Sequence, residues 1–83
     1  MTKLLCPPRP ISVSRDPRGS PAHLGEGAFG GRIQVLSRWL TQLDWWCQPV
    51  EREYWRIIVA DSMLCEIFLD LTTQRWWLER IYD

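Results

Sequence analysis

The chain has 83 residues, a formal net charge of zero, 46% hydrophobic residues and 24% charged residues. This length allows a single domain, and the composition is that of a globular chain rather than a disordered one. The zero net charge argues against a general polyanion binder, and no apolar run approaches the length of a membrane span.

The first part of the chain is rich in turn-forming residues. All five glycines and five of the six prolines precede residue 32, so residues 1–31 are predicted to be an extended Pro/Gly-rich arm with edge segments. Within it, Ile11–Ser14 alternates like a short edge strand. Asp16–Gly19 fits a type I turn, which would let Pro21–Leu24 pair back onto that strand.

Residues 32–83 form the predicted Trp-rich β domain. The apolar spacing of Ile33–Leu40 fits one short helix about as well as a bulged strand. Beyond it, Tyr54–Val59, Met63–Leu69 and Trp76–Tyr82 alternate as strands and are separated by the polar turns Asp61-Ser62 and Asp70–Gln74. The fold class is therefore mainly β, a small antiparallel meander or half-open barrel.

All six tryptophans lie in this second part, and four of them form two Trp-Trp pairs. Each pair ends the phrase Leu-Thr-x-x-x-Trp-Trp, at Leu40–Trp46 and at Leu71–Trp77, and we expect each phrase to be a strand end, a polar turn and the start of a strand. Adjacent strand residues point to opposite faces, so one indole of each pair should face the core. The predicted core comprises Ile33, Val35, Trp39, Trp55, Ile57, Ile67, Leu69, Trp76, Leu78 and Ile81.

The sequence contains no convincing enzymatic or metal site. Residues 24–30 match the glycine-rich loop of protein kinases, but every other kinase motif is missing, so a linking loop is the better interpretation. His23 is the only histidine, and the odd set Cys6, Cys47 and Cys65 lacks paired spacing. We expect no metal, no cofactor and no catalysis, and reduced thiols in a cytoplasmic protein, with Cys47 and Cys65 acting as small hydrophobes.

Arginines alternate with aromatic residues along the second part, and three interpretations compete. Exposed indoles could anchor another protein. Alternatively, Trp46, Tyr54, Trp77 and neighbouring arginines could bind single-stranded nucleic acid weakly. A third possibility is that Arg and Trp pack on each other within the sheet. The residues predicted to contact a partner are Trp45, Trp46, Tyr54, Trp76, Trp77, Arg38 and Arg56.

The order of motifs over roughly residues 9–83 resembles a known bacterial domain. The matching segments are Gly19–Pro21, Arg38-Trp39, Trp45-Trp46, Arg52–Tyr54, Phe68–Asp70, Arg75–Leu78 and Ile81–Asp83. They resemble a small module of uncharacterised function at the C-terminus of ImuB-type, Y-family polymerase-like proteins of the bacterial mutasome, which also occurs as short free-standing proteins. The chain departs from that pattern at Gly25–Gly31 and at Asp61-Ser62, where an aromatic basic strand and an Asp-Gly turn are usual.

This resemblance implies a bacterial accessory module linked to DNA repair or translesion synthesis, with a polymerase-associated factor as its partner. It carries no catalytic residue over to this chain. We therefore expect a non-enzymatic protein-interaction module, with weak single-strand binding as the alternative.

Overall fold

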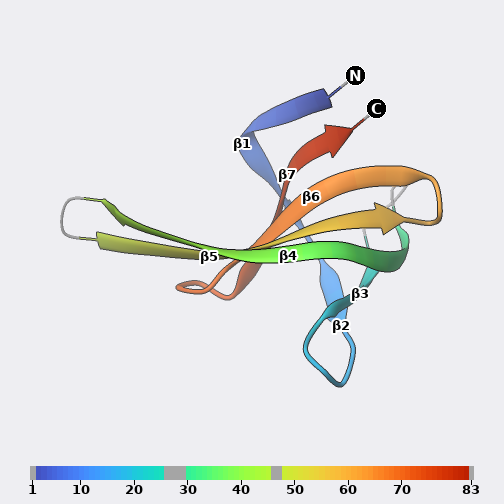
Figure 1. The fold of residues 1–83 in the computed structure, drawn as a ribbon, viewed down its shortest axis with the longest axis horizontal. Coiled ribbons are helices and arrows are strands. Elements are labelled where there is room, and N and C mark those ends of the chain that lie inside the picture. Colours follow the sequence, from blue (N-terminus) through green and yellow to red (C-terminus); the bar gives the residue numbers. More distant parts are fainter. Residues whose placement is uncertain (1, 26–29, 46–47, 83) are drawn as a thin grey trace.

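A computed structural model of the protein describes residues 2–25, 30–45 and 48–82, with side chains at positions 4–25, 30–41 and 51–82. The described residues form seven strands and no helix (Figure 1). The strands are β1 (Thr2–Ile11), β2 (Val13–Arg15), β3 (Pro21–Leu24), β4 (Gly31–Trp45), β5 (Gln48–Val59), β6 (Met63–Asp70) and β7 (Arg75–Tyr82). The prediction of a mainly β fold is confirmed.

The strands form one antiparallel sheet in the order β1-β7-β6-β5-β4-β3-β2. Its two outermost strands, β1 and β2, are separated by Ser12 alone, so a single segment pairs with β7 through its first part and with β3 through its second. This arrangement curls the sheet into a half-barrel. The Arg15 guanidinium of β2 lies 5.2 Å from the ring centroid of Trp76 on β7, which shows how close the two ends of the sheet come.

The predicted meander is present as β5-β6-β7. Its first turn has Ala60 and Asp61 at positive φ, 53° and 58°, and the Ser62 N–H donates to the Val59 carbonyl at 3.1 Å. These angles define a type I′ turn, whose twist matches that of the strands it joins. In the second turn the Asp70 carboxylate accepts the backbone N–H of Thr72 at 2.9 Å.

The predicted N-terminal hairpin is also confirmed. β2 pairs with β3, and the turn between them has the Gly19 N–H donating to the Asp16 carbonyl at 2.9 Å. The Asp16 carboxylate also accepts the N–H groups of Arg18 and Ser20, both at 2.9 Å. Asp16, at the first position of the turn, therefore stabilises the Asp16–Gly19 turn that the sequence predicted.

Residues 33–40 are strand, not helix, and the strand carries a bulge. The pairing with β5 shifts between Val35 and Ser37, so Leu36 is the extra residue. A bulge reverses the alternation of side chains beyond it. Trp39 therefore pairs with Tyr54 on the face opposite the core, and its assignment to the core is wrong. Val35 is also exposed and is not a core residue, because it lies where β4 has no neighbour beyond β5.

The core fills the concave face of the half-barrel. Seven of the predicted core residues are buried there, and Ile81 is partly buried against them. The prediction missed Leu24, Val59 and Cys65. Leu24 is completely buried although it belongs to β3, so the N-terminal segments contribute to the core itself. The buried residues are Leu24, Ile33, Trp55, Ile57, Val59, Cys65, Ile67, Leu69, Trp76 and Leu78.

The two Leu-Thr-x-x-x-Trp-Trp phrases adopt different structures. Leu71–Gln74 is a turn that leads into β7, as predicted, and Trp76 faces the core while Trp77 does not. The first phrase does not contain the predicted turn, because β4 continues through Leu40 to Trp45. The difference lies in the preceding residue: Asp70 caps the second turn, whereas Trp39 occupies that position in the first phrase.

β4 and β5 extend beyond the rest of the sheet. Their pairing runs out to Trp45↔Gln48, whereas β6 pairs with β5 only from Arg52 onward. The outer part is thus a two-stranded ribbon that projects from the body (Figure 1). Trp45 ends β4 on this ribbon; Trp46 and Cys47 lie outside the described residues.

A close backbone approach near the first turn yields a stability prediction. A Cβ at Gly31 would lie 2.8 Å from the Ala60 Cβ, well inside normal contact. We expect Gly31→Ala to lower the free energy of unfolding by about 1–3 kcal/mol, the usual cost of overpacking. In an Ala60→Gly background the same substitution should cost much less, because the clashing methyl is gone. Urea denaturation of the four proteins measures this coupling, and equal costs in both backgrounds would contradict the contact.

The buried thiol of Cys65 predicts an alkaline dependence of stability. Burial, reinforced by the Glu66 carboxylate, raises the pKa of Cys65 from 9.0 to about 11. The native state thus retains a proton that the unfolded chain loses first. This contribution to stability is fully present below pH 9 and is lost as pH rises toward 11. Urea unfolding between these pH values should show a steeper loss in the wild type than in Cys65→Ala.

The control for this measurement is Cys6→Ala, which removes an exposed thiol and should leave the pH slope unchanged. In a Cys47→Ser background at pH 8, a thiol reagent should modify Cys6 quickly and Cys65 only on unfolding. Equal reaction rates at the two positions would show that Cys65 is not shielded.

Candidate functional site: the outer face of β4–β7

The convex side of β4–β7, opposite the core, carries most of the polar and aromatic chemistry of the described residues; we call it the outer face. Its members follow from strand alternation: the neighbours of core residues point outward. Tyr54 alternates with Trp55, Phe68 with Ile67 and Leu69, and Trp77 with Trp76 and Leu78.

Four rings form a row across the outer face, one from each strand. Trp39 stacks on Tyr54 with centroids 5.4 Å apart and planes within 4°. Tyr54 contacts Phe68 at 5.2 Å, and Phe68 contacts Trp77 at 6.5 Å. Each contact joins residues that are directly opposite on neighbouring strands, where such pairs stabilise a sheet. Tyr54 and Phe68 are buried in the middle, while Trp39 and Trp77 remain partly accessible at the ends.

Arginines cover several of these rings. The Arg52 guanidinium lies 4.5 Å from the Phe68 centroid. Arg56 lies 5.9 Å from Trp39 and 5.6 Å from Tyr82. The interleaving of Arg and Trp in the sequence therefore corresponds to intramolecular cation–π packing, but between strands and not between sequence neighbours.

Glu66 is a buried carboxylate in the middle of this face, with 5% of its surface exposed. It accepts hydrogen bonds from Arg56 Nε at 3.2 Å and Nη2 at 3.0 Å, and from the Tyr82 hydroxyl. A buried charge needs such partners to offset its desolvation. Glu66 thus holds Arg56 in the position from which it covers Trp39.

The titration of the surrounding groups follows from these contacts. Burial raises the pKa of Tyr54, and the nearby Glu79 carboxylate adds to the rise while Arg52 opposes it. The hydrogen bond to Glu66 raises the pKa of Arg56, and a hydrogen bond to Tyr82 raises that of Arg80. Tyr54 therefore stays neutral and both arginines stay cationic through the physiological pH range.

The structure brings some of the predicted contact residues together and separates others. Tyr54, Trp77 and Arg56 share the outer face, but Tyr54 is buried within the ring row. Trp76 lies in the core, 4.9 Å from Trp55, and presents little surface to a partner.

Arg38, on the concave side, pairs with Glu53 and lies 5.7 Å from Trp55. Only the backbone of Trp45 is described, and the prediction for Trp46 falls outside the described residues.

Sequence reasoning missed Phe68, Arg52 and Trp39 as members of this face. Phe68 could have been found, because it alternates with Ile67 and Leu69 and so must point away from the core. Trp39 could not, because the apolar pattern fits a helix as well as a bulged strand and does not show that the extra residue is Leu36.

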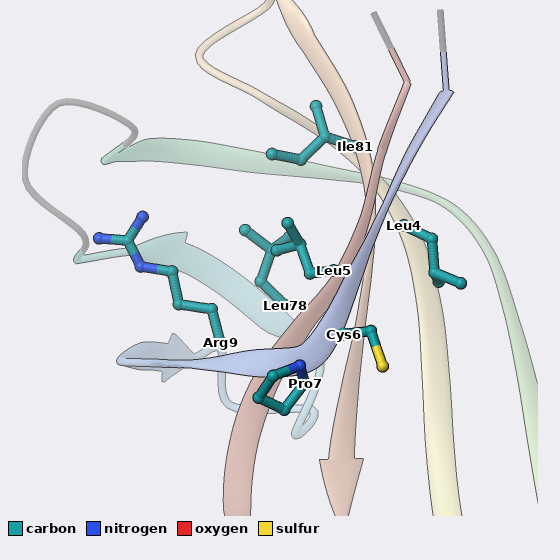
Figure 2. Close-up of a pocket in the computed structure, with 7 residues that line it drawn as sticks. All are labelled: Leu4, Leu5, Cys6, Pro7, Arg9, Leu78 and Ile81. Carbon is teal, nitrogen blue, oxygen red and sulfur yellow. The ribbon is translucent and has the colours of Figure 1, made fainter.

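A cavity of about 400 Å³ lies beside the irregular part of β1. There the pairing with β7 shifts between Leu4 and Arg9, and the Cys6–Pro7 bond is cis. Leu5, Leu78, Ile81 and Arg9 lie on one side of the β1–β7 pair, with Leu4 and Cys6 on the other (Figure 2). The residues that line this cavity provide apolar contacts and one guanidinium, that of Arg9, and they contain no acid–base pair.

The described residues bring together no group of three or more His, Cys, Asp or Glu side chains that could hold a metal ion. His23 is exposed on β3, opposite Ser14 and Arg32. Of the acidic residues in the second part, Glu53 and Glu66 pair with arginines and Asp70 caps a turn.

Across the described ranges, no helix is long and apolar enough to cross a membrane. Comparison of the chain with protein-family models, curated proteins and solved structures gives no match in any of the three.

Proposed function

We propose that the protein is a non-enzymatic interaction module that binds another protein by adding an extended segment of that partner to the open side of β4. The observation that carries the proposal is that, among the described residues, most of this strand has no neighbour on the side away from β5. Only Gly31 and Arg32, of the 15 residues of β4, pair with β3, although the rest of β4 apart from the bulged Leu36 pairs with β5 on the other side. An open strand presents unpaired N–H and C=O groups to a partner.

The side chains along this open stretch are apolar to an unusual degree. Four of the five large hydrophobic residues that are exposed in the described structure lie between positions 35 and 40. They are Val35 at 39%, Leu36 at 48%, Trp39 at 36% and Leu40 at 56% exposed. Exposed, long, apolar edges are usually avoided or protected because they recruit other strands. Their presence here supports a surface that a partner covers.

The alternative of single-strand binding along the whole ring row has less support. Tyr54 and Phe68 are buried, and Arg52 and Arg56 already lie over the rings that bases would need. Only the two ends of the row, Trp39 and Trp77, remain open, and Trp39 belongs to the β4 surface as well.

The identity of the partner is proposed from the sequence resemblance alone. That resemblance points to a polymerase-associated factor in bacterial DNA repair or translesion synthesis. A cytoplasmic location is proposed from the widely spaced, odd set of cysteines. The Arg38-Trp39 motif that contributes to it lies at the centre of the open stretch of β4.

A charge placed on this strand should weaken partner binding. Leu40→Lys puts an ammonium on the open strand without touching the buried core. We expect it to weaken partner capture from the native host about tenfold or more, since anchoring residues carry most of the energy of an interface. Leu4→Lys is the matched control, because Leu4 is 57% exposed on β1, and it should bind normally. The measurement is quantitative mass spectrometry of proteins retained by each variant.

Hydrogen exchange supplies the second measurement. Strand addition should slow exchange of β4 amides beyond Arg32 when the partner is bound, more than that of other strands. Unchanged capture by Leu40→Lys, or protection confined to strands other than β4, would overturn the proposal. A captured set without any polymerase-associated factor would overturn only the link to DNA repair.

A further inference from the structure

We infer that a pocket at the Trp77 end of the ring row binds a nucleotide: a planar heteroaromatic base stacked on Trp77, with its phosphate held by Arg52 and Arg75. This site is independent of the open side of β4. The pocket has a volume of about 240 Å³ and is lined by Pro7, Pro8, Arg52, Phe68, Asp70 and Trp77.

The pocket exists because β1 is irregular where it passes the outer face. Pairing between β1 and β7 is interrupted between Leu4 and Arg9. It resumes with Arg9 opposite Leu78, and Pro10 then lies opposite Trp77. Pro7 and Pro8 lie in the interruption and form one wall, while the sheet surface forms the other. The volume is below the range of sites for drug-sized ligands, so it suits a single ring system.

Trp77 is the ring that can receive a base. Phe68 is buried between Tyr54 and Trp77, and its face is covered by Arg52. Trp77 ends the row, is only half-buried, and lines the pocket. A base stacked on Trp77 would add one more ring to the row, next to its last member.

Two guanidiniums at this end of the row are available to a phosphate. Arg52 lines the pocket, and Arg75 lies directly opposite Asp70, another lining residue, on the neighbouring strand. Neither forms an ion pair within the described side chains, and Arg52 Nε has no acceptor there although it is buried. The Asp70 carboxylate is oriented by the backbone N–H groups of Thr72 and Thr73, from which it accepts hydrogen bonds. The pocket thus joins a half-buried indole to the Arg52 guanidinium, with Arg75 on the adjacent strand.

The test is binding of adenosine monophosphate, measured by calorimetry, and of a labelled oligo(dA), measured by anisotropy, both at low salt. Trp77→Leu should weaken binding roughly tenfold, as loss of one base–aromatic stack does. Arg52→Gln and Arg75→Gln should each reduce the salt slope for oligo(dA) by about 0.7. Trp39→Leu, at the other end of the row, and Arg18→Gln, in an exposed turn, are the matched controls and should bind like the wild type. Circular dichroism melting verifies that each variant is folded.

Oligo(dA) binding tighter than the mononucleotide would identify a nucleotide within a single strand, and equal affinities would identify a free nucleotide. Either result supports the site. No binding of either probe at low salt would overturn it, as would equal losses in Trp77→Leu and Trp39→Leu. Leu40→Lys should retain nucleotide binding, so failure of this site and failure of strand addition at β4 can be told apart.

Discussion

The fold depends on one segment serving both ends of the sheet. Residues 2–15 supply β1, which pairs with β7, and β2, which pairs with β3, with only Ser12 between them. A sheet held at both ends by the same short segment must curl. The curl gives a concave side deep enough to bury Leu24 and Ile57 completely in a chain of 83 residues. It also leaves a convex side that no second layer covers within the described structure, and the outer face is the result.

On that uncovered face, the aromatic and charged side chains contact one another within the chain. The rings stack across four strands, arginines lie over them, and Glu66 anchors Arg56. Such packing replaces the apolar layer that usually covers a sheet, because guanidinium stems and ring faces exclude water while their polar edges remain hydrated. Two surfaces are not covered by this ring and arginine packing: the pocket beside Trp77 and the part of β4 that has no neighbour on one side.

The sequence predicted the second half of this fold well because alternation there is regular. In Tyr54–Val59 and Met63–Leu69 every second residue is apolar, so Trp55, Ile57 and Ile67 could be assigned to the core directly. β4 resisted prediction because a single extra residue, Leu36, changes which face Trp39 occupies without changing the apolar composition. Similarly, no local pattern shows that β3 and the core are in contact, since the burial of Leu24 depends on long-range closure. Of the contact residues proposed from sequence, Trp77 and Arg56 occupy the outer face. Trp76 lies opposite Leu69 and is buried in the core.

The ribbon formed by the ends of β4 and β5 makes one part of the molecule free to change over evolutionary time. It consists of two strands, whereas in the body of the sheet β5 also pairs with β6, and β6 pairs with β7. Substitutions along it alter little of the strand pairing on which folding of the body depends, because cooperative units in proteins follow such contacts. Selection can therefore vary the ribbon's sequence while the half-barrel that carries it stays the same.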